Sequence, residues 1–107
     1  MPADPSRLGE VEQLVLLAVL RLESGAYAVP IRDVIETHTG IALARGSIYI
    51  TLDRLEQRGL VESAMSEPTP EPGGKSRRVF RIRPAGIAAL RAARRAVDRL
   101  AAGTLLG

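Results

Sequence analysis

The sequence predicts a mainly α-helical domain with one small β-hairpin. Three helical segments with apolar stripes come first, two strand-like segments around a Pro- and Gly-rich loop follow, and a long amphipathic helix closes the chain. The 107 residues are 46% hydrophobic and 25% charged, which is typical of one ordinary globular domain.

The N-terminal part reads as an arm followed by two helices. Residues 1–7, MPADPSR, hold two prolines and no periodicity, so we expect a flexible arm. From about Gly9 to Glu23 apolar residues cover more than one face, which indicates a helix buried on several sides. We expect a second helix to begin near Pro30 and to stop at Gly40, because proline suits a first turn and glycine a left-handed end.

The middle of the chain predicts a helix and a hairpin. The residues IAL at 41–43 are enough only for a short strand or an extended connector. A third helix is expected from about Arg45 to Arg58, with Gly59 as its stop. The segments LVESAMS and RRVFRIR then read as two strands, and EPTPEPGGK between them forms a long hairpin tip.

The last helix carries a seam for a partner. It is expected from Pro84 to about Ala102, and apolar residues recur in it at alternating spacings of three and four. Three helices, a hairpin and a closing helix are the element order of a winged helix-turn-helix domain. We therefore divide the chain into the arm (1–7), a winged helix-turn-helix domain (8–83, with a recognition helix at about 45–58 and a wing at about 60–83) and a dimerisation helix with its tail (84–107).

Charge is unevenly distributed along the chain. Residues 1–74 contain six Lys/Arg against eleven Asp/Glu, a net of −5, whereas residues 75–107 contain nine against one, a net of +8. A basic end on an acidic body favours a polyanionic partner, although a run of arginines on a helix is also typical of a solvated face.

The predicted third helix has two distinct faces. At about 100° per residue, Ile48, Leu52 and Leu55 fall within one narrow arc and form the core face. Ile50 points the opposite way, where an apolar side chain suits contact with a thymine methyl in a DNA major groove. A single exposed aliphatic residue also occurs without any function. The outward face and its flanks carry Gly46, Ser47, Tyr49, Ile50, Asp53, Arg54 and Gln57.

These residues resemble a known family. The stretch GSIYITLDRLEQRGLVES, then GGKSRRVFRI and an Ala-Gly pair at the last helix, is similar to the PadR family of bacterial transcriptional regulators, as is LGEVEQLVLLAVLRLESGAYAVPIRDVI near the start. The resemblance covers residues 8 to about 100. It implies a homodimeric winged-helix DNA-binding protein, usually a repressor of a pseudo-palindromic operator, whose last helix packs against the partner's first helix. The chain resembles the short form with a single C-terminal helix.

The resemblance and the helix faces together select candidate residues. We expect Arg54, Tyr49 and Ser47 to matter most for reading bases, and the wing to neutralise phosphates. The DNA-binding candidates are Arg45, Ser47, Tyr49, Ile50, Arg54, Lys75, Arg77 and Arg78. The dimerisation candidates are Val11, Leu14, Leu90, Ala93, Val97 and Leu100. We assign Arg91, Arg94, Arg95 and Arg99 mainly to solvation and pairing between subunits.

Three positions depart from the family pattern. Ala44 stands where a helix-capping Ser is frequent, and losing such a cap costs on the order of 1 kcal/mol. Arg83 stands where Thr is common, and Pro84 partly offsets that loss by fixing the first turn. Ile50 stands where Pro is frequent, so the preferred bases are expected to differ.

Other functions receive less support from the sequence. A winged helix can serve as a protein-interaction module without reading DNA, and Glu67 and Glu71 in the wing loop dilute its positive charge. Ser47, Tyr49, Asp53 and His38 do not form a credible catalytic set, so we expect no enzyme. The chain has no Cys and one His, and we expect no metal or other cofactor. The apolar run LVLLAVL is too short to span a bilayer, so we expect a cytoplasmic protein without membrane contact.

Relatives by resemblance include regulators that bind phenolic acids or flat hydrophobic drugs through aromatic side chains near the dimer interface. A small-molecule effector of unknown identity is therefore one expected kind of partner. This chain has no Trp, one Phe and two Tyr, which does not favour a stacking pocket of that type. We expect Tyr27 to be a core or dimer contact rather than a ligand clamp.

Overall fold

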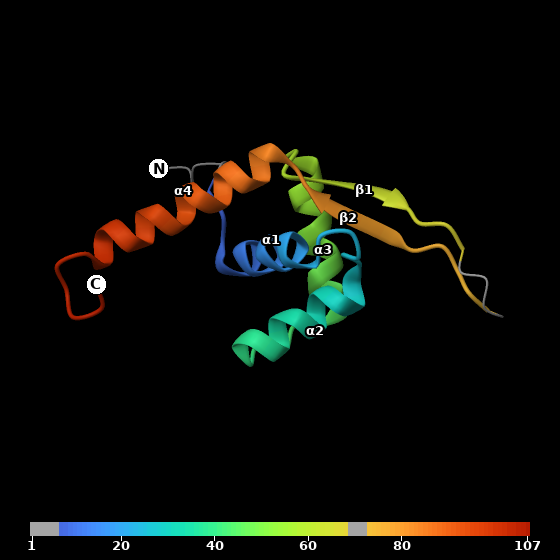
Figure 1. Cartoon of the computed structure of the whole chain (residues 1–107), viewed down its shortest axis with the longest axis horizontal. Helices are drawn as coiled ribbons and strands as arrows, with labels where there is room; N and C mark the ends of the chain where they lie inside the picture. The colour runs from blue at the N-terminus through green and yellow to red at the C-terminus, as the bar shows by residue number, and fades with distance from the viewer. Residues whose placement is uncertain (1–6, 69–72) are drawn as a thin grey trace.

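The computed structural model describes residues 7–68 and 73–107, and it confirms the predicted fold class. Three helices, α1 (Glu10–Leu22), α2 (Ala28–Thr39) and α3 (Arg45–Gln57), form the body. The antiparallel strands β1 (Val61–Met65) and β2 (Arg78–Ile82) form the hairpin, and α4 (Pro84–Ala101) closes the chain. In Figure 1 the hairpin extends from one side of the helical body and α4 from the other. The predicted arm, except Arg7, and residues 69–72 of the predicted hairpin tip lie outside the described residues.

The helix boundaries follow local sequence signals. At the start of α1, the backbone N–H of Gly9 donates to the Glu12 carboxylate at 2.8 Å. The prediction for the start of α2 was wrong by two residues, because the helix begins at Ala28 and Pro30 occupies its third position. Any N–H in the first turn lacks an intrahelical acceptor, so proline is tolerated there as well as at the first position.

The two predicted glycine stops are confirmed. Gly40 and Gly59 both have φ of +74°, a left-handed conformation that side-chain-bearing residues rarely adopt. His38 lies in the last turn of α2, where its Nδ1 is 2.9 Å from the carbonyl oxygen of Val34. Residues 41–44 form a connector rather than a strand.

One hydrophobic core joins the three helices to the hairpin. Val15, Leu16, Ile31 and Leu52 are fully or almost fully buried in it, together with Phe80 from β2. The N–H of Phe80 also donates to the Ala26 carbonyl at 2.7 Å, which makes a single β-bridge between the hairpin and the α1–α2 connection. The hairpin root is therefore fixed to the helical body.

Helix α4 begins in the core and then leaves it. Its first turn lies so close to the α3–β1 connection that a Cβ on Gly86 would fall 2.3 Å from the Leu60 carbonyl oxygen. Leu90, at 3% exposure, is buried with the core. Farther along, Val97 and Leu100 are 64% and 84% exposed. The outer half of α4 therefore presents apolar side chains to solvent.

Candidate nucleic-acid interface

The two faces of α3 are as the sequence predicts. Ile48, Leu52 and Leu55 have no exposed surface, whereas Tyr49 and Ile50 on the other side are 44% and 55% exposed. Exposed apolar or aromatic side chains on a helix whose opposite face is fully buried are free to contact a partner. We refer to α3 as the reading helix and to its exposed side as the reading face.

The polar candidates on α3 are also exposed. Arg45 lies at the first helical position, and Ser47 and Arg54 flank the reading face. Within the described ranges these three side chains form no ion pair with the rest of the chain. Ala44 precedes the helix in an extended conformation and gives no side-chain hydrogen bond, so the N–H groups of the first turn remain open.

The wing consists of β1, β2 and the loop that joins them. Its candidate Lys75 is exposed, at the described edge of the loop. Arg77 lies over the ring of Tyr27 at 4.6 Å from the centroid and donates from Nη1 to the Tyr27 hydroxyl at 3.1 Å. Tyr27 therefore supports a wing arginine. Because the contact to Tyr27 involves no carboxylate, it does not compensate the positive charge of Arg77.

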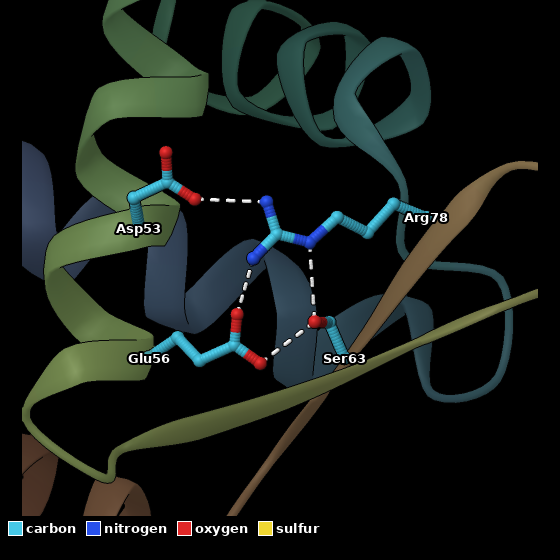
Figure 2. Close-up of polar contacts among 4 residues, drawn as sticks. All are labelled: Asp53, Glu56, Ser63 and Arg78. Carbon is cyan, nitrogen blue, oxygen red and sulfur yellow. Dashed lines mark hydrogen bonds and ion pairs between the residues drawn. The ribbon is translucent and has the colours of Figure 1, made fainter.

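Arg78 lies in a different environment from Arg77 and Lys75. Figure 2 shows its guanidinium between the reading helix and the wing. Nη1 donates to Asp53 Oδ1 at 2.8 Å, Nε donates to Ser63 Oγ at 3.1 Å, and Nη2 donates to Glu56 Oε1. Ser63 in turn donates to Glu56 Oε2 at 2.7 Å. We call these four residues the Arg78 cluster.

The charges of the Arg78 cluster reinforce one another. The hydroxyl of Ser63 lowers the pKa of Glu56 below its ordinary value, and Arg78 lowers it further against the opposing effect of burial. The hydrogen bond to Asp53, followed by that to Glu56, raises the pKa of Arg78. Glu56 and Arg78 are therefore charged at neutral pH, and the Arg78 cluster is an ion-pair network rather than a proton-transfer site.

Sequence reasoning did not find the roles of Glu56 and Ser63. One signal was present in the sequence: Asp53 and Glu56 are three residues apart, so they share one side of α3. Strand alternation could also have placed Ser63 and Arg78 on one face of the hairpin. The missing information was how far the wing lies from α3, because that distance depends on contacts across the fold.

The dimerisation candidates fall into three environments. Val11, Val97 and Leu100 are exposed, which leaves them available to another chain. Leu14 and Ala93 are half-buried. Leu90 is committed to the core of its own chain and offers almost no surface to a partner. Within residues 7–68 and 73–107, no helix combines the length and apolar character needed to cross a bilayer.

A helix with a solvent-exposed reading face, held beside a basic wing, defines the class of winged helix-turn-helix proteins. A sequence profile of the transcriptional regulator PadR-like family matches residues 16–92. The chain belongs to this family, whose members are transcriptional regulators rather than enzymes.

Individual relatives agree with this assignment. The chain is 43% identical over 68 residues to Transcriptional regulator Rv3488 of Mycobacterium tuberculosis, a match that spans 64% of this chain and 60% of that protein. It is 27% identical to a PadR family transcriptional regulator from Eggerthella lenta, with a TM-score of 0.68 over 88% of this chain and 81% of the other. A PadR family regulator from Clostridium difficile shares the fold, with a TM-score of 0.71 and 20% identity over 87% and 95% of the two chains.

Proposed function

We propose that the chain is a homodimeric repressor that reads a pseudo-palindromic DNA operator. The reading face of α3 supports this proposal most strongly, because its exposed Tyr49 and Ile50 lie between polar side chains suited to base edges and phosphates. Since bacterial DNA lies in the cytoplasm, we place the action of the protein there.

The proposed contacts divide into base reading and backbone binding. Arg54 is suited to the O6 and N7 acceptors of guanine, Ser47 to either a base or a phosphate, and Ile50 to a thymine methyl. Arg45 at the helix start and Lys75 and Arg77 in the wing are suited to phosphates, which would give affinity that falls with salt. Tyr49 lies on the flank of the reading face, where it contacts the groove in this arrangement.

Two unpartnered apolar surfaces support the proposed dimer. The outer half of α4 exposes Val97 and Leu100, and the following tail exposes Leu105 and Leu106. A hollow between α1 and α2 is lined mainly by apolar side chains, among them Leu14, Leu17 and Val34. Packing the outer part of α4 from one subunit against α1 of the other would cover both surfaces. The basic residues of α4 would then lie near the more acidic body of the partner.

Substitution of the reading face tests the DNA contacts. The native fragment is the DNA immediately upstream of the gene that encodes this chain. We expect the double variant Tyr49→Ala, Arg54→Ala to bind this fragment at least about tenfold more weakly, because base contacts are lost. Arg32→Ala, which removes one positive charge from α2 outside the reading face and the proposed dimer surfaces, is the matched control and should bind almost normally. Unchanged affinity of the double variant, in a protein that is still folded, would show that this face does not read DNA.

Sedimentation tests the dimer separately. Leu100→Asp places a charge on the exposed seam, so we expect it to convert dimers to monomers at concentrations where the original chain is dimeric. Ala102→Asp places the same charge just beyond the helix and is the control.

A reporter gene behind the operator, expressed with and without the protein, distinguishes repression from activation.

The alternative is a protein-interaction module that does not read DNA. Arg78 favours it to the extent that its charge is paired with Asp53 and Glu56 within the chain. The exposed polar residues of the reading face favour the repressor. Absence of binding to any DNA at low salt would support the interaction module.

A further inference from the structure

We propose that Arg78 is a positioning residue that fixes the wing to the reading helix, and that it acts through Asp53, Glu56 and Ser63 instead of through a phosphate. This inference rests on the reading face proposed above. It assigns a different role to Arg78 than to Lys75 and Arg77, although all three are basic residues of the same wing.

The first support is the use of the guanidinium. Each of its three nitrogens has its own acceptor within the chain: Nη1 has Asp53, Nη2 has Glu56 and Nε has Ser63 (Figure 2). The face of the guanidinium also lies over the Phe80 ring, 4.9 Å from its centroid. A planar fork can satisfy these acceptors together, whereas the point charge of a lysine cannot.

The second support is the position of the partners in the fold. Asp53 and Glu56 belong to α3, and Ser63 belongs to β1. Arg78 is the first residue of β2 and pairs with Met65. This pair ends the described strand ladder, opposite the Val61–Ile82 pair at the hairpin root. The cluster therefore ties the outer part of the wing to the reading helix. The preceding residue, Arg77, reaches Tyr27 at the start of α2, so adjacent arginines connect the wing to two different helices.

The third support is electrostatic. Asp53 lies on the reading helix with a side chain that is 54% exposed, and a free carboxylate there would repel DNA phosphates. Arg78 balances one of the two negative charges of Asp53 and Glu56. It also engages Oδ1, one of the two Asp53 carboxylate oxygens that could otherwise accept a hydrogen bond from a base.

Sequence-specific binding should depend on this arrangement more than non-specific binding does. Simultaneous base and phosphate contacts require a fixed angle between helix and wing, whereas non-specific attraction requires only positive charge. Loss of the cluster should therefore lower the ratio of specific to non-specific affinity.

The first test is Arg78→Lys, measured by fluorescence anisotropy on the native upstream fragment and on a scrambled one. The positive charge is retained, so a phosphate contact would survive with almost normal affinity. We expect instead that preference for the native fragment falls by at least about tenfold. Arg77→Lys is the matched control, and we expect a smaller change because its contact to Tyr27 uses one hydrogen bond. Normal preference in Arg78→Lys would overturn the proposal.

Exchanging the charges at positions 56 and 78 distinguishes loss of the Arg78 cluster from general loss of folding. Arg78→Glu should abolish specific binding, and adding Glu56→Arg should restore it by at least about tenfold, since the introduced guanidinium can pair with the introduced carboxylate and with Asp53. Adding Glu56→Arg to Arg77→Glu measures the general gain from extra positive charge on α3. Circular dichroism and thermal unfolding establish that each variant is folded.

The outcomes distinguish failure of the positioning role of Arg78 from failure of the proposed DNA-reading function. Greater recovery in the Arg78→Glu background than in the Arg77→Glu background supports the positioning role. Equal recovery in both backgrounds overturns it, because the gain then comes from added positive charge on α3 and not from restored pairing between positions 56 and 78. If the original chain does not distinguish native from scrambled DNA, the proposed reading function fails first. The positioning role then fails with it, because there is no reading geometry to maintain.

Discussion

At the scale of single residues, Ile50 is a side chain that packing of the core does not explain. Ile48 and Leu52 of the same helix are buried in the core, but Ile50 is more than half exposed. The core gains nothing from this side chain. We propose that it contacts a thymine methyl, a role that would depend on DNA alone.

Uracil substitution tests the role of Ile50 directly. Replacing thymines with uracils in the operator half-sites removes only the methyl groups. We expect this change to weaken binding of the original chain severalfold, within the about 1–3 kcal/mol that one base contact is worth, and to have little effect on Ile50→Ala. Parallel titrations by fluorescence anisotropy measure both. Equal sensitivity of the two proteins to uracil would mean that Ile50 does not contact these methyl groups.

Glu56 provides a residue-scale prediction about pH. Ser63 and Arg78 hold the pKa of Glu56 below its ordinary value of 4.5. A carboxyl whose pKa is lower in the folded state stabilises that state above its unfolded pKa, and this contribution is lost as pH falls through the folded value. We therefore expect Glu56→Gln to destabilise the protein at about pH 7 and to do so much less at about pH 3.

Urea unfolding at the two pH values measures this difference. Glu62→Gln is the control, because Glu62 is an exposed residue of β1 outside the Arg78 cluster. A stability difference between the original chain and Glu56→Gln that is constant with pH would contradict the account of the cluster.

At the scale of elements, the start of the reading helix is its weakest local feature. Ala44 has the extended backbone of a capping residue, with φ of −67° and ψ of 143°, but it has no side-chain acceptor. We expect Ala44→Ser to raise the free energy of unfolding by about 1 kcal/mol, because its hydroxyl can accept from the first-turn N–H groups. Ala42→Ser in the connector is the control. Equal effects of the two substitutions on the midpoint of urea unfolding would refute a capping gain.

The junction of α4 with the body depends on Gly86. Because a Cβ there would lie 2.3 Å from a backbone carbonyl, we expect Gly86→Ala to lower the free energy of unfolding by about 1–3 kcal/mol. Gly46→Ala is a matched control, since a Cβ at this helical glycine meets no atom within 4 Å. It should raise stability by about 0.5–1 kcal/mol. Thermal unfolding that gives both variants the same sign would contradict this packing account.

The elements predicted from sequence were those with local causes. The apolar stripe of α3 and the stops at Gly40 and Gly59 depend on helix periodicity and backbone conformation, and both are confirmed. The start of α2 was misplaced because proline fits anywhere in a first turn. The Ala26–Phe80 bridge and the Arg78 cluster join distant segments, so no local pattern could reveal them.

The candidate site shows the same division. Exposure of Tyr49, Ile50 and Arg54 follows from the helix wheel. In contrast, the sequence grouped Arg78 with Lys75 and Arg77 because composition does not distinguish a free arginine from a paired one. It also grouped Leu90 with the dimer seam, since a periodic apolar stripe indicates burial but not which surface covers it.

At the scale of the whole molecule, the domain separates three tasks. The reading helix faces outward beside the wing, the core holds both to the body, and α4 extends away with its outer apolar residues exposed (Figure 1). Pairing through α4 would place two reading helices in one symmetric assembly. Two such helices match half-sites about one helical turn apart.

Binding of the chain to the DNA upstream of its own gene is the most direct test of sequence-specific reading by α3. The purified chain is titrated by fluorescence anisotropy against the native fragment and a scrambled one, across a series of salt concentrations. We expect a preference for the native fragment of about a thousandfold or more, with affinity for both fragments falling as salt rises. Equal binding to both fragments at every salt concentration would contradict sequence-specific reading of that DNA by α3.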